Sequence, residues 1–424
     1  MTDKENILLV NKHVLIYVDR QLTNLDLVYN KELEYIKNNF CGVVFSVIES
    51  FNNFDCSSDV ILYLCGDIEK NYNEIKNIEN KLINVITELS YNYDHVNCEL
   101  INIGQVPINI YNVGIYFRNL FSLNKDYFNL ISNEHNFQEL TESNKPSTAF
   151  RTGIYLTKVD EINDEINFKL LRCSSNFSGP TDNFRDTDNE IINQINTISE
   201  PFFEEKAELN HVLAQIYENK IVDTGVKQVE RKAKIKTHSD KTKDMPGNGL
   251  ICFTTFYKNY SNGMFNDIES KCIKKSTNDF YDYCFKDVSI LTKIRFRLKK
   301  MASDVKLKKI FDVTLYPNSA FIIPLSTNRL YTHEIIPSSL PIEKIPIRLG
   351  YVIRCSKTTA VFKDNEVYIT ENDDYIKLEE PDIKGVKELK KKNLYFKENI
   401  TDSVIHYDKF YFSLNKGDYK KPII

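Results

Sequence analysis

Short apolar runs rich in β-branched residues constrain the fold of this chain more than any other sequence feature. In its second half they are separated by turn-forming residues, and they comprise SAFIIPL (319–325), IPIRLGYVIRC (345–355), TAVFK (359–363) and EVYIT (366–370). Earlier runs of the same kind are HVLAQIY (211–217), KAKIKTH (232–238) and LICFTTFY (250–257). Several short strands separated by turn signals are typical of an all-β barrel or jelly roll.

The first 112 residues have a different pattern. Strand-like runs at 13–18, 42–48 and 59–65 alternate with segments that favour helices. The longest helical candidate is 67–90, where Ile75, Ile78, Leu82, Ile86 and Leu89 recur at steps of three or four residues. We predict a small α/β unit with no glycine-rich phosphate loop. Asp19, which follows the first strand, is interpreted as a turn or cap residue rather than a site residue.

Composition narrows the class of protein. A formal net charge of -4 excludes a chain that binds nucleic acid over its whole surface and leaves only local basic patches. Nine cysteines with no CxxC pair indicate reduced thiols in an intracellular compartment, cytoplasmic or nuclear, rather than a zinc ribbon or a disulfide scaffold. No apolar stretch reaches the roughly 18 residues of a membrane span, and the first residues lack a signal-peptide core.

Two of the seven histidines lie in distinctive settings. His238 and Asp240, in THSD, are two residues apart at the end of a predicted strand, so both can face one metal ion. His333, in NRLYTHEI, is the natural third ligand. Two histidines and one carboxylate on one face of an octahedron leave the opposite face open, which is the geometry of non-haem iron(II) oxygenases. An HxD pair alone also occurs by chance, and His211 is a further candidate ligand that we interpret as structural.

Two arginines lie six residues apart in IRLGYVIR. This even spacing puts Arg348 and Arg354 on the same face of an apolar strand. A buried arginine needs an anionic partner, because an unpaired interior charge is costly. Each guanidinium either pairs with a protein carboxylate, or the two bind a dicarboxylate co-substrate, which suits their planar, bidentate geometry.

These motifs, in this order, resemble the Fe(II)- and 2-oxoglutarate-dependent dioxygenases, most closely the AlkB-like branch. The run LNHVLAQIY is similar to the strand in which that branch carries Asn-x-Tyr. The resemblance covers roughly 205–365 and implies an α+β fold, with a double-stranded β-helix (jelly-roll) core, flanking helices and the small N-terminal α/β unit. It implies that His238, Asp240 and His333 bind iron(II). Arg348 would form a salt bridge to the distal carboxylate of 2-oxoglutarate, and Arg354 would lie near the other carboxylate or beside Asp240. Tyr217 would hydrogen-bond to 2-oxoglutarate, with Gln215 beside it.

The chain departs from the family pattern in three places. Gln215 stands where the family has asparagine, and the intervals from Tyr217 to His238 and from Asp240 to His333 are long. We therefore predict three regions: an α/β unit of unknown role at 1–112, a dioxygenase domain at 113–375 and a charged C-terminal extension at 376–424. Within the middle region we expect a substrate lid at about 113–200 and a less regular, charged insertion at about 258–312.

The resemblance implies that dioxygen and 2-oxoglutarate are used for oxidative demethylation or hydroxylation of a nucleic-acid base, with methylated DNA or RNA as partner. Basic runs at 231–243 and 293–309 are either phosphate contacts or solvated faces. In the polar loop 174–190, Phe177, Phe184 and Arg185 either stack on a base or anchor the loop.

The sequence also allows three alternatives to a dioxygenase that acts on nucleic-acid bases. The same iron centre also suits a hydroxylase of proteins or small molecules. A binding module can retain the fold without turnover. Finally, the motifs can be accidental, with His238 a surface residue.

Overall fold

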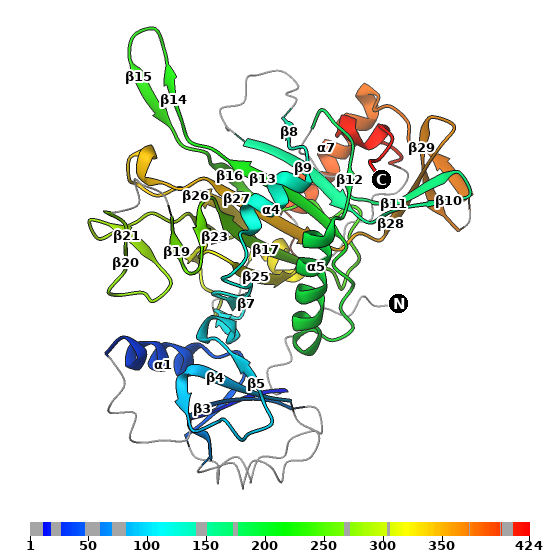
Figure 1. Cartoon of the computed structure of the whole chain (residues 1–424). Helices are drawn as coiled ribbons and strands as arrows, with labels where there is room; N and C mark the ends of the chain where they lie inside the picture. Colours follow the sequence, from blue (N-terminus) through cyan, green and yellow to red (C-terminus); the bar gives the residue numbers. More distant parts are fainter. Residues whose placement is uncertain are drawn as a thin grey trace.

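The computed structural model describes residues 12–17, 27–46, 60–69, 82–140, 151–172, 177–266, 272–302, 306–372, 374–398, 400 and 410–424. Over these residues the fold is mixed α/β and consists mostly of strands, with few helices (Figure 1). None of the helices in the described part of the chain is both long and apolar enough to cross a membrane. The predicted cap residue Asp19 lies outside the described residues.

The largest sheet has nine strands and is antiparallel except where β12 meets β9. Its order is β12-β9-β13-β27-β17-β25-β7-β6, and β8 pairs with β9. The strands are β6 (Ile108–Ile110), β7 (Gly114–Phe117), β8 (Gln138–Glu139), β9 (Arg151–Thr157), β12 (Asp182–Asn183), β13 (His211–Tyr217), β17 (Leu250–Tyr257), β25 (Ser319–Pro324) and β27 (Arg348–Arg354).

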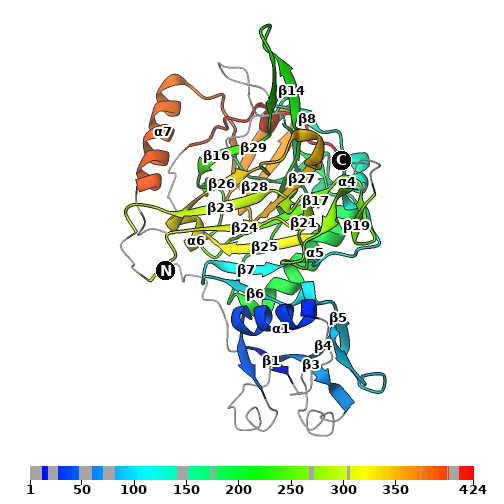
Figure 2. The same ribbon diagram turned by 90° about the vertical axis from the view of Figure 1, so that its left-hand side faces the viewer.

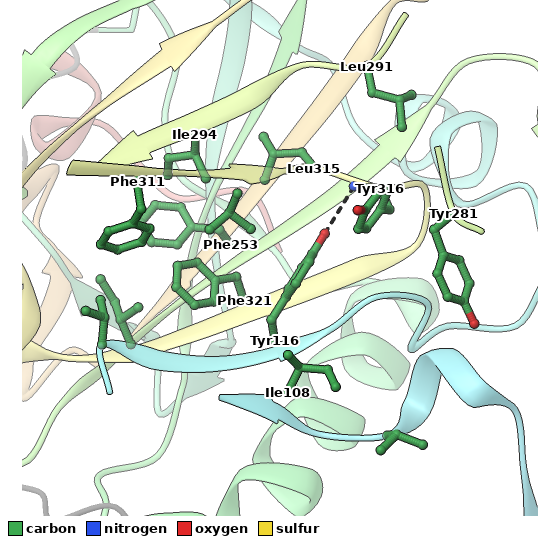
Figure 3. Packing of buried hydrophobic residues seen from close by; sticks show 14 of the residues in the cluster. Ile108, Tyr116, Phe253, Tyr281, Leu291, Ile294, Phe311, Leu315, Tyr316 and Phe321 are labelled. Atoms are coloured by element: carbon green, nitrogen blue, oxygen red, sulfur yellow. Dashed lines mark hydrogen bonds between the residues drawn. The ribbon is translucent and has the colours of Figure 1, made fainter. Parts of the chain in front are cut away.

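A second, four-stranded antiparallel sheet packs against this one. Its order is β16 (Ile235–His238), β26 (Tyr331–Ile336), β23 (Lys293–Leu298) and β24 (Ile310–Thr314). Figure 3 shows side chains of the two sheets meeting, among them Phe253 and Phe321 from the large sheet and Ile294 and Phe311 from the small one. In the same view the Tyr116 hydroxyl accepts a hydrogen bond from the backbone N–H of Tyr316.

The other face of the large sheet is covered by α4 (Tyr127–Glu134) and α5 (Asp186–Ser199), whose apolar residues join a second cluster. Because side chains alternate along a strand, Leu349, Tyr351 and Ile353 of β27 belong to this cluster. Arg348 and Arg354 therefore face the small sheet. α5 begins inside the segment 174–190 that was predicted as a loop; the Asp188 carboxylate accepts from the backbone N–H of Arg185 at 2.8 Å, which caps the start of the helix at Asp186.

The N-terminal residues form a five-stranded, wholly parallel sheet that lies beside the two-sheet body (Figures 1 and 2). Its order is β2 (Val43–Phe45), β1 (His13–Tyr17), β3 (Ile61–Asp67), β4 (Leu82–Tyr91) and β5 (Glu99–Ile101), with α1 (Leu27–Asn39) beside it.

The helix expected over 67–90 is wrong in its second half: residues 68–69 are helical, but 82–91 form the strand β4. Residues four apart share a face in a strand as well as in a helix, so the spacing of Leu82 and Ile86 fits both. In β4 the consecutive residues Asn84, Val85 and Ile86 are all buried, as is usual for a parallel sheet covered on both faces. Ile75 and Ile78, also predicted on this helix, lie outside the described residues.

The irregular insertion expected at 258–312 is also partly wrong. It contains short pairs, β18 (Tyr260–Ser261) with β19 (Met264–Phe265) and β20 (Lys274–Lys275) with β21 (Tyr283–Phe285) and β22 (Val288–Ser289). Its last part, however, supplies β23 and most of β24 of the small sheet. The basic residues of KIRFRL conceal this role, because they alternate with the buried side chains of Ile294 and Phe296.

The remaining elements flank this body. A five-stranded sheet contains β10 (Val159–Ile162), β11 (Glu165–Leu170), β28 (Thr358–Lys363), β29 (Glu366–Glu371) and β30 (Asp374–Lys377). A hairpin of β14 (Lys220–Asp223) and β15 (Gln228–Arg231) projects from the top of the molecule in Figure 1. Two further helices are α6 (Leu325–Leu330), directly after β25, and α7 (Ile383–Glu398), on the outside of the body in Figure 2.

Candidate metal centre and anion pocket

The structure brings together the three residues proposed from sequence as metal ligands. One ligand atom each from His238, Asp240 and His333 lies within 4.8 Å of the others. The Oδ1 atom of Asp240 is 3.3 Å from Nε2 of His238 and 3.8 Å from Nε2 of His333. Two imidazole nitrogens and a carboxylate oxygen at these separations can bind one divalent ion.

The backbone explains this convergence. His238 ends β16 and pairs with His333 on β26, so the two imidazoles are cross-strand neighbours. Asp240 lies in the loop after β16, where Asn328 of α6 holds its backbone: Asn328 Oδ1 accepts from the Asp240 N–H at 2.8 Å, and Asn328 Nδ2 donates to the Asp240 carbonyl at 2.9 Å. The hydroxyl of Ser239 donates to the carbonyl of Tyr331, which ties this loop to the start of β26.

The protonation states of Asp240 and His333 suit a cation. Burial would raise the pKa of Asp240, but the Arg354 guanidinium and the hydrogen bond from His238 hold it well below its usual range. Burial lowers the pKa of His333 to about 3, so this imidazole is neutral. His238 Nδ1 lies 2.9 Å from the carbonyl oxygen of Lys236, and donation to that oxygen leaves Nε2 to face a metal.

The two arginines of β27 have different partners. Arg354 binds Oδ2 of Asp240 through Nε and Nη2, at 2.9 and 2.6 Å. Of the two positions that the resemblance allowed for Arg354, the structure therefore shows the one beside Asp240. Arg348 makes no ion pair with any carboxylate of the described residues, and its Nη2 is buried without a hydrogen-bond partner. Its guanidinium lies over the ring of Tyr217, with Cζ 4.1 Å from the ring centroid.

Further polar groups around Arg348 lack partners. The Tyr217 hydroxyl donates to Oε1 of Gln215 at 2.8 Å, which leaves the Nε2 of Gln215 buried and unbonded. Thr255 is opposite Gly350 in the sheet, and its hydroxyl is also buried without a partner. Gly350 makes room for this arrangement, because a Cβ there would lie 2.7 Å from Nη1 of Arg348.

All these groups line one cavity of about 270 Å³ between the two sheets. Its walls also include the apolar side chains of Leu213, Phe253, Ile294 and Ile335. The metal ligands, the unpaired donors of Arg348, Gln215 and Thr255, and the apolar walls together fit a metal ion and a carboxylate-bearing small molecule. Burying these donors unpaired is costly, whereas a bound carboxylate would satisfy them.

We predict that Asn328→Ala weakens metal binding about 10–100-fold, the range typical of residues that orient metal ligands. The substitution leaves the backbone N–H and carbonyl of Asp240 without their partners, so its carboxylate loses its fixed position. Calorimetric titration with Mn(II) or Zn(II) measures the affinity. Asn219→Ala is a matched control, because Asn219 also accepts from a backbone N–H, that of Ala233, but is absent from the cavity. Equal affinities of wild type and Asn328→Ala would contradict this role.

Sequence reasoning did not identify Asn328, Thr255 or Arg151 as parts of this site. A lone Asn in TNRL, a Thr in an apolar strand and an Arg that starts a strand carry no motif. Their positions depend on which strands and helices are neighbours in space. A hydrophilic residue inside an otherwise apolar run was the available signal for Thr255.

The structure places the other candidates in structural roles. Phe177 is fully buried and packs with Tyr155 and Leu213, so it anchors its segment and cannot stack on a base. Phe184 packs partly buried against the helix-covered cluster, and Arg185 pairs with Asp182. His211 is buried and lies outside the metal-ligand group.

Several basic side chains of the two basic runs already have partners within the chain. Arg295 pairs with Asp312 and Arg297 with Glu334. Lys243 is buried, and its Nζ donates to the carbonyl of Phe410 at 2.9 Å. Cys252 and Cys355 are buried.

A second acidic group surrounds His135, where Nδ1 lies 2.8 Å from Asp182 and Nε2 lies 2.8 Å from Asp188. Asp188 also accepts from the Tyr351 hydroxyl, and Arg185 pairs with Asp182. Both ring nitrogens are thus occupied by carboxylates, and the group is an ion-pair cluster that joins α4, β12 and α5. Burial disfavours the charged imidazole, but the bonds to Asp182 and Asp188 raise the pKa of His135 to about 9.

This cluster predicts a loss of stability in alkali. A raised pKa gives stability that is fully present below the unfolded value of 6.5 and is lost as pH rises through about 9. At 1.36 kcal/mol per unit, the contribution is about 3 kcal/mol. Denaturant unfolding of wild type and His135→Gln should therefore show a stability difference that shrinks between pH 6.5 and 9.5. A difference that stays constant over this range would contradict the charged state of His135.

Comparison with known proteins gives little further information. No protein-family model matches the chain, and a search of curated proteins finds no match. Among solved structures, OsALKBH1 is similar, with 12% identity over 57% of this chain and 97% of that one, at a TM-score of 0.32. The non-heme alpha ketoglutarate dependent epimerase SnoN from nogalamycin biosynthesis is similar with 9% identity over 59% and 82%, also at 0.32. Such scores are too low to support an argument, so the proposals below rest on the site and on the sequence motifs.

Proposed function

We propose that the chain is an Fe(II)- and 2-oxoglutarate-dependent dioxygenase whose two facing sheets form a double-stranded β-helix. The observation that carries the proposal is the convergence of His238, Asp240 and His333 in the cavity that also contains the unpaired guanidinium of Arg348. A metal site alone would suit many proteins. A metal site beside an unpaired buried arginine suits a co-substrate that chelates the metal at one end and carries a carboxylate at the other.

In this proposal His238, Asp240 and His333 hold the iron. When bound, iron and 2-oxoglutarate supply the oxidising chemistry, in which dioxygen is consumed, 2-oxoglutarate becomes succinate and carbon dioxide, and a C–H bond of the substrate is oxidised. Arg354 keeps the Asp240 carboxylate ionised and fixes its orientation. Losing this ion pair would leave a buried cation alone beside the metal.

The chain's other residues bind and orient the co-substrate. Arg348 and the Thr255 hydroxyl donate to its distal carboxylate, and the Nε2 of Gln215 is a further donor. Hydrogen bonding of 2-oxoglutarate by Tyr217 stays a prediction; its hydroxyl donates to Gln215, and its ring supports the Arg348 guanidinium. Phe253, Ile294 and Ile335 exclude water from the cavity, which strengthens each of these charge-assisted bonds.

For the substrate, we propose a base of methylated DNA or RNA, demethylated or hydroxylated by this centre. The support is the resemblance of THSD, NRLYTHEI and IRLGYVIR to the AlkB-like branch. Phe177 is buried and does not stack on a base, and Arg295 and Arg297 already pair with carboxylates. Phosphate contacts by the lysines of the run 293–309 stay a prediction. The predicted regions 1–112, 113–375 and 376–424 and an intracellular location are part of the same proposal.

The test has two stages. Anaerobic addition of Fe(II) and 2-oxoglutarate should produce a weak visible metal-to-ligand charge-transfer band in the wild type. With dioxygen, succinate release is then compared across methylated oligonucleotides and a peptide panel. A band without oligonucleotide-stimulated succinate would retain the dioxygenase and reject the nucleic-acid substrate. Absence of the band would reject the iron and co-substrate site.

A further inference from the structure

The cavity contains a guanidinium that the proposed co-substrate does not account for. Arg151 is the first residue of β9 and lines the cavity. Its Nε is buried without a hydrogen-bond partner, and no carboxylate of the described residues forms an ion pair with it. The Arg151 side chain is half-buried, and burying its Nε–H group without a partner is costly, so the position favours a bound anion.

The sheet register places Arg151 near Arg348 but not beside it. Arg151 pairs across strands with Tyr217, and Tyr217 pairs with Arg348 on its other side. One strand therefore separates the two arginines, and their Cα atoms are roughly 10 Å apart, two inter-strand spacings. Arg348 lies against the ring of the intervening Tyr217. The backbone positions of the two arginines thus lie on opposite sides of this tyrosine.

Charge accounting leads to the same conclusion. Asp240 is the one carboxylate among the described residues that line the cavity, and Arg354 already binds it. A bound 2-oxoglutarate would bring two carboxylates, of which the metal takes one and Arg348 the other. Arg151 would remain without a counter-charge even in the complex with metal and co-substrate.

We propose that Arg151 binds an oxyanion of the substrate that is oxidised, a phosphate ester or a carboxylate, beside the co-substrate. This inference rests on the proposed function and narrows its substrate class to anionic molecules. A planar guanidinium that holds such a group with paired hydrogen bonds fixes the distance from the anion to the metal. Arg151 is then a residue that determines which C–H bond of the substrate faces the metal.

The experiment uses the full chain loaded with Zn(II) and N-oxalylglycine, which occupy the metal and co-substrate positions without turnover. Thermal unfolding is followed while sodium phosphate, sodium acetate or sodium chloride is added at matched ionic strength. The variants are Arg151→Gln, Arg151→Lys and, as a control with the same charge change, Lys158→Gln. Lys158 follows β9 directly and its side chain is 73% exposed. Calorimetry measures N-oxalylglycine binding to each variant.

We expect a saturable stabilisation of the wild type and Lys158→Gln by phosphate or acetate beyond that of chloride. In Arg151→Gln the affinity for that anion should fall about tenfold or more, the usual effect of losing a charge-assisted hydrogen bond, with partial recovery in Arg151→Lys. The affinity of N-oxalylglycine should change less than about threefold. Preference for phosphate indicates a phosphate ester as substrate, and preference for acetate indicates a carboxylate.

Two results would overturn the inference. One is stabilisation by neither anion in the wild type. The other is a tenfold or greater loss of N-oxalylglycine affinity in Arg151→Gln, which would make Arg151 part of the co-substrate site. Failure of N-oxalylglycine to bind the wild type would instead contradict the proposed function, and the phosphate and acetate titrations of the zinc-loaded protein would still decide whether Arg151 binds an anion.

Discussion

His238→Ala is expected to lower the affinity for Fe(II) by at least about 100-fold while leaving the fold intact. Even residues that only orient metal ligands are typically worth about 10–100-fold in affinity, and loss of a ligand costs more. His238 is the best ligand to remove, because its side chain is 39% exposed, whereas those of Asp240 and His333 are at most 8% exposed. Its truncation therefore opens no core cavity and should change the free energy of unfolding by less than about 0.5 kcal/mol.

Anaerobic Fe(II) titration, followed by the charge-transfer band with 2-oxoglutarate, measures the effect. His95→Ala is the matched control, since His95 is an exposed histidine that is absent from the cavity. If His238→Ala kept the band and an unchanged affinity for Fe(II), His238 would not be a metal ligand, and the proposed function would be contradicted.

Arg348→Ala is expected to weaken 2-oxoglutarate binding by about 100-fold or more without weakening metal binding. Two charge-assisted hydrogen bonds to a carboxylate, at about 1.5–3 kcal/mol each, correspond to a loss of at least about 3 kcal/mol. Arg348→Lys should recover only part of this affinity, because an ammonium group cannot reproduce the bidentate contact or the stacking on Tyr217. The substitution also removes a buried charge that lacks a carboxylate partner, so the metal-free protein should lose little stability.

Calorimetric titration of the Zn(II)-loaded protein with 2-oxoglutarate separates this effect from metal binding. Arg295→Gln is the control, because it removes one arginine whose guanidinium pairs with Asp312 away from the cavity. Equal 2-oxoglutarate affinities of Arg348→Ala and wild type would show that the unpaired guanidinium has another ligand.

The predictions that depend on strand periodicity agree with the structure. His211–Tyr217, Leu250–Tyr257 and Arg348–Arg354 are strands, and their apolar residues alternate between two buried faces. Two expectations were wrong in part, each for its own physical reason: the helix at 67–90, of which 82–90 form a strand, and the irregular insertion at 258–312, whose end supplies β23. A spacing of four residues does not distinguish a helix from a strand, and charged residues on the outer face of β23 hide the alternation beneath them.

The sequence by itself determined which side chains are available for the site and that Arg348 and Arg354 share a face of β27. Local periodicity fixes this relation, because side-chain direction in a strand repeats every two residues. Asp240, by contrast, lies in the loop beyond the end of β16, and its approach to His238 depends on the hydrogen bonds with Asn328. Tertiary structure alone decided that Arg354 pairs with Asp240, that Arg348 keeps an unpaired guanidinium, and that Arg151 and Thr255 line the same cavity. These relations depend on which strands are neighbours, and distant segments become neighbours only through the packing of the two sheets.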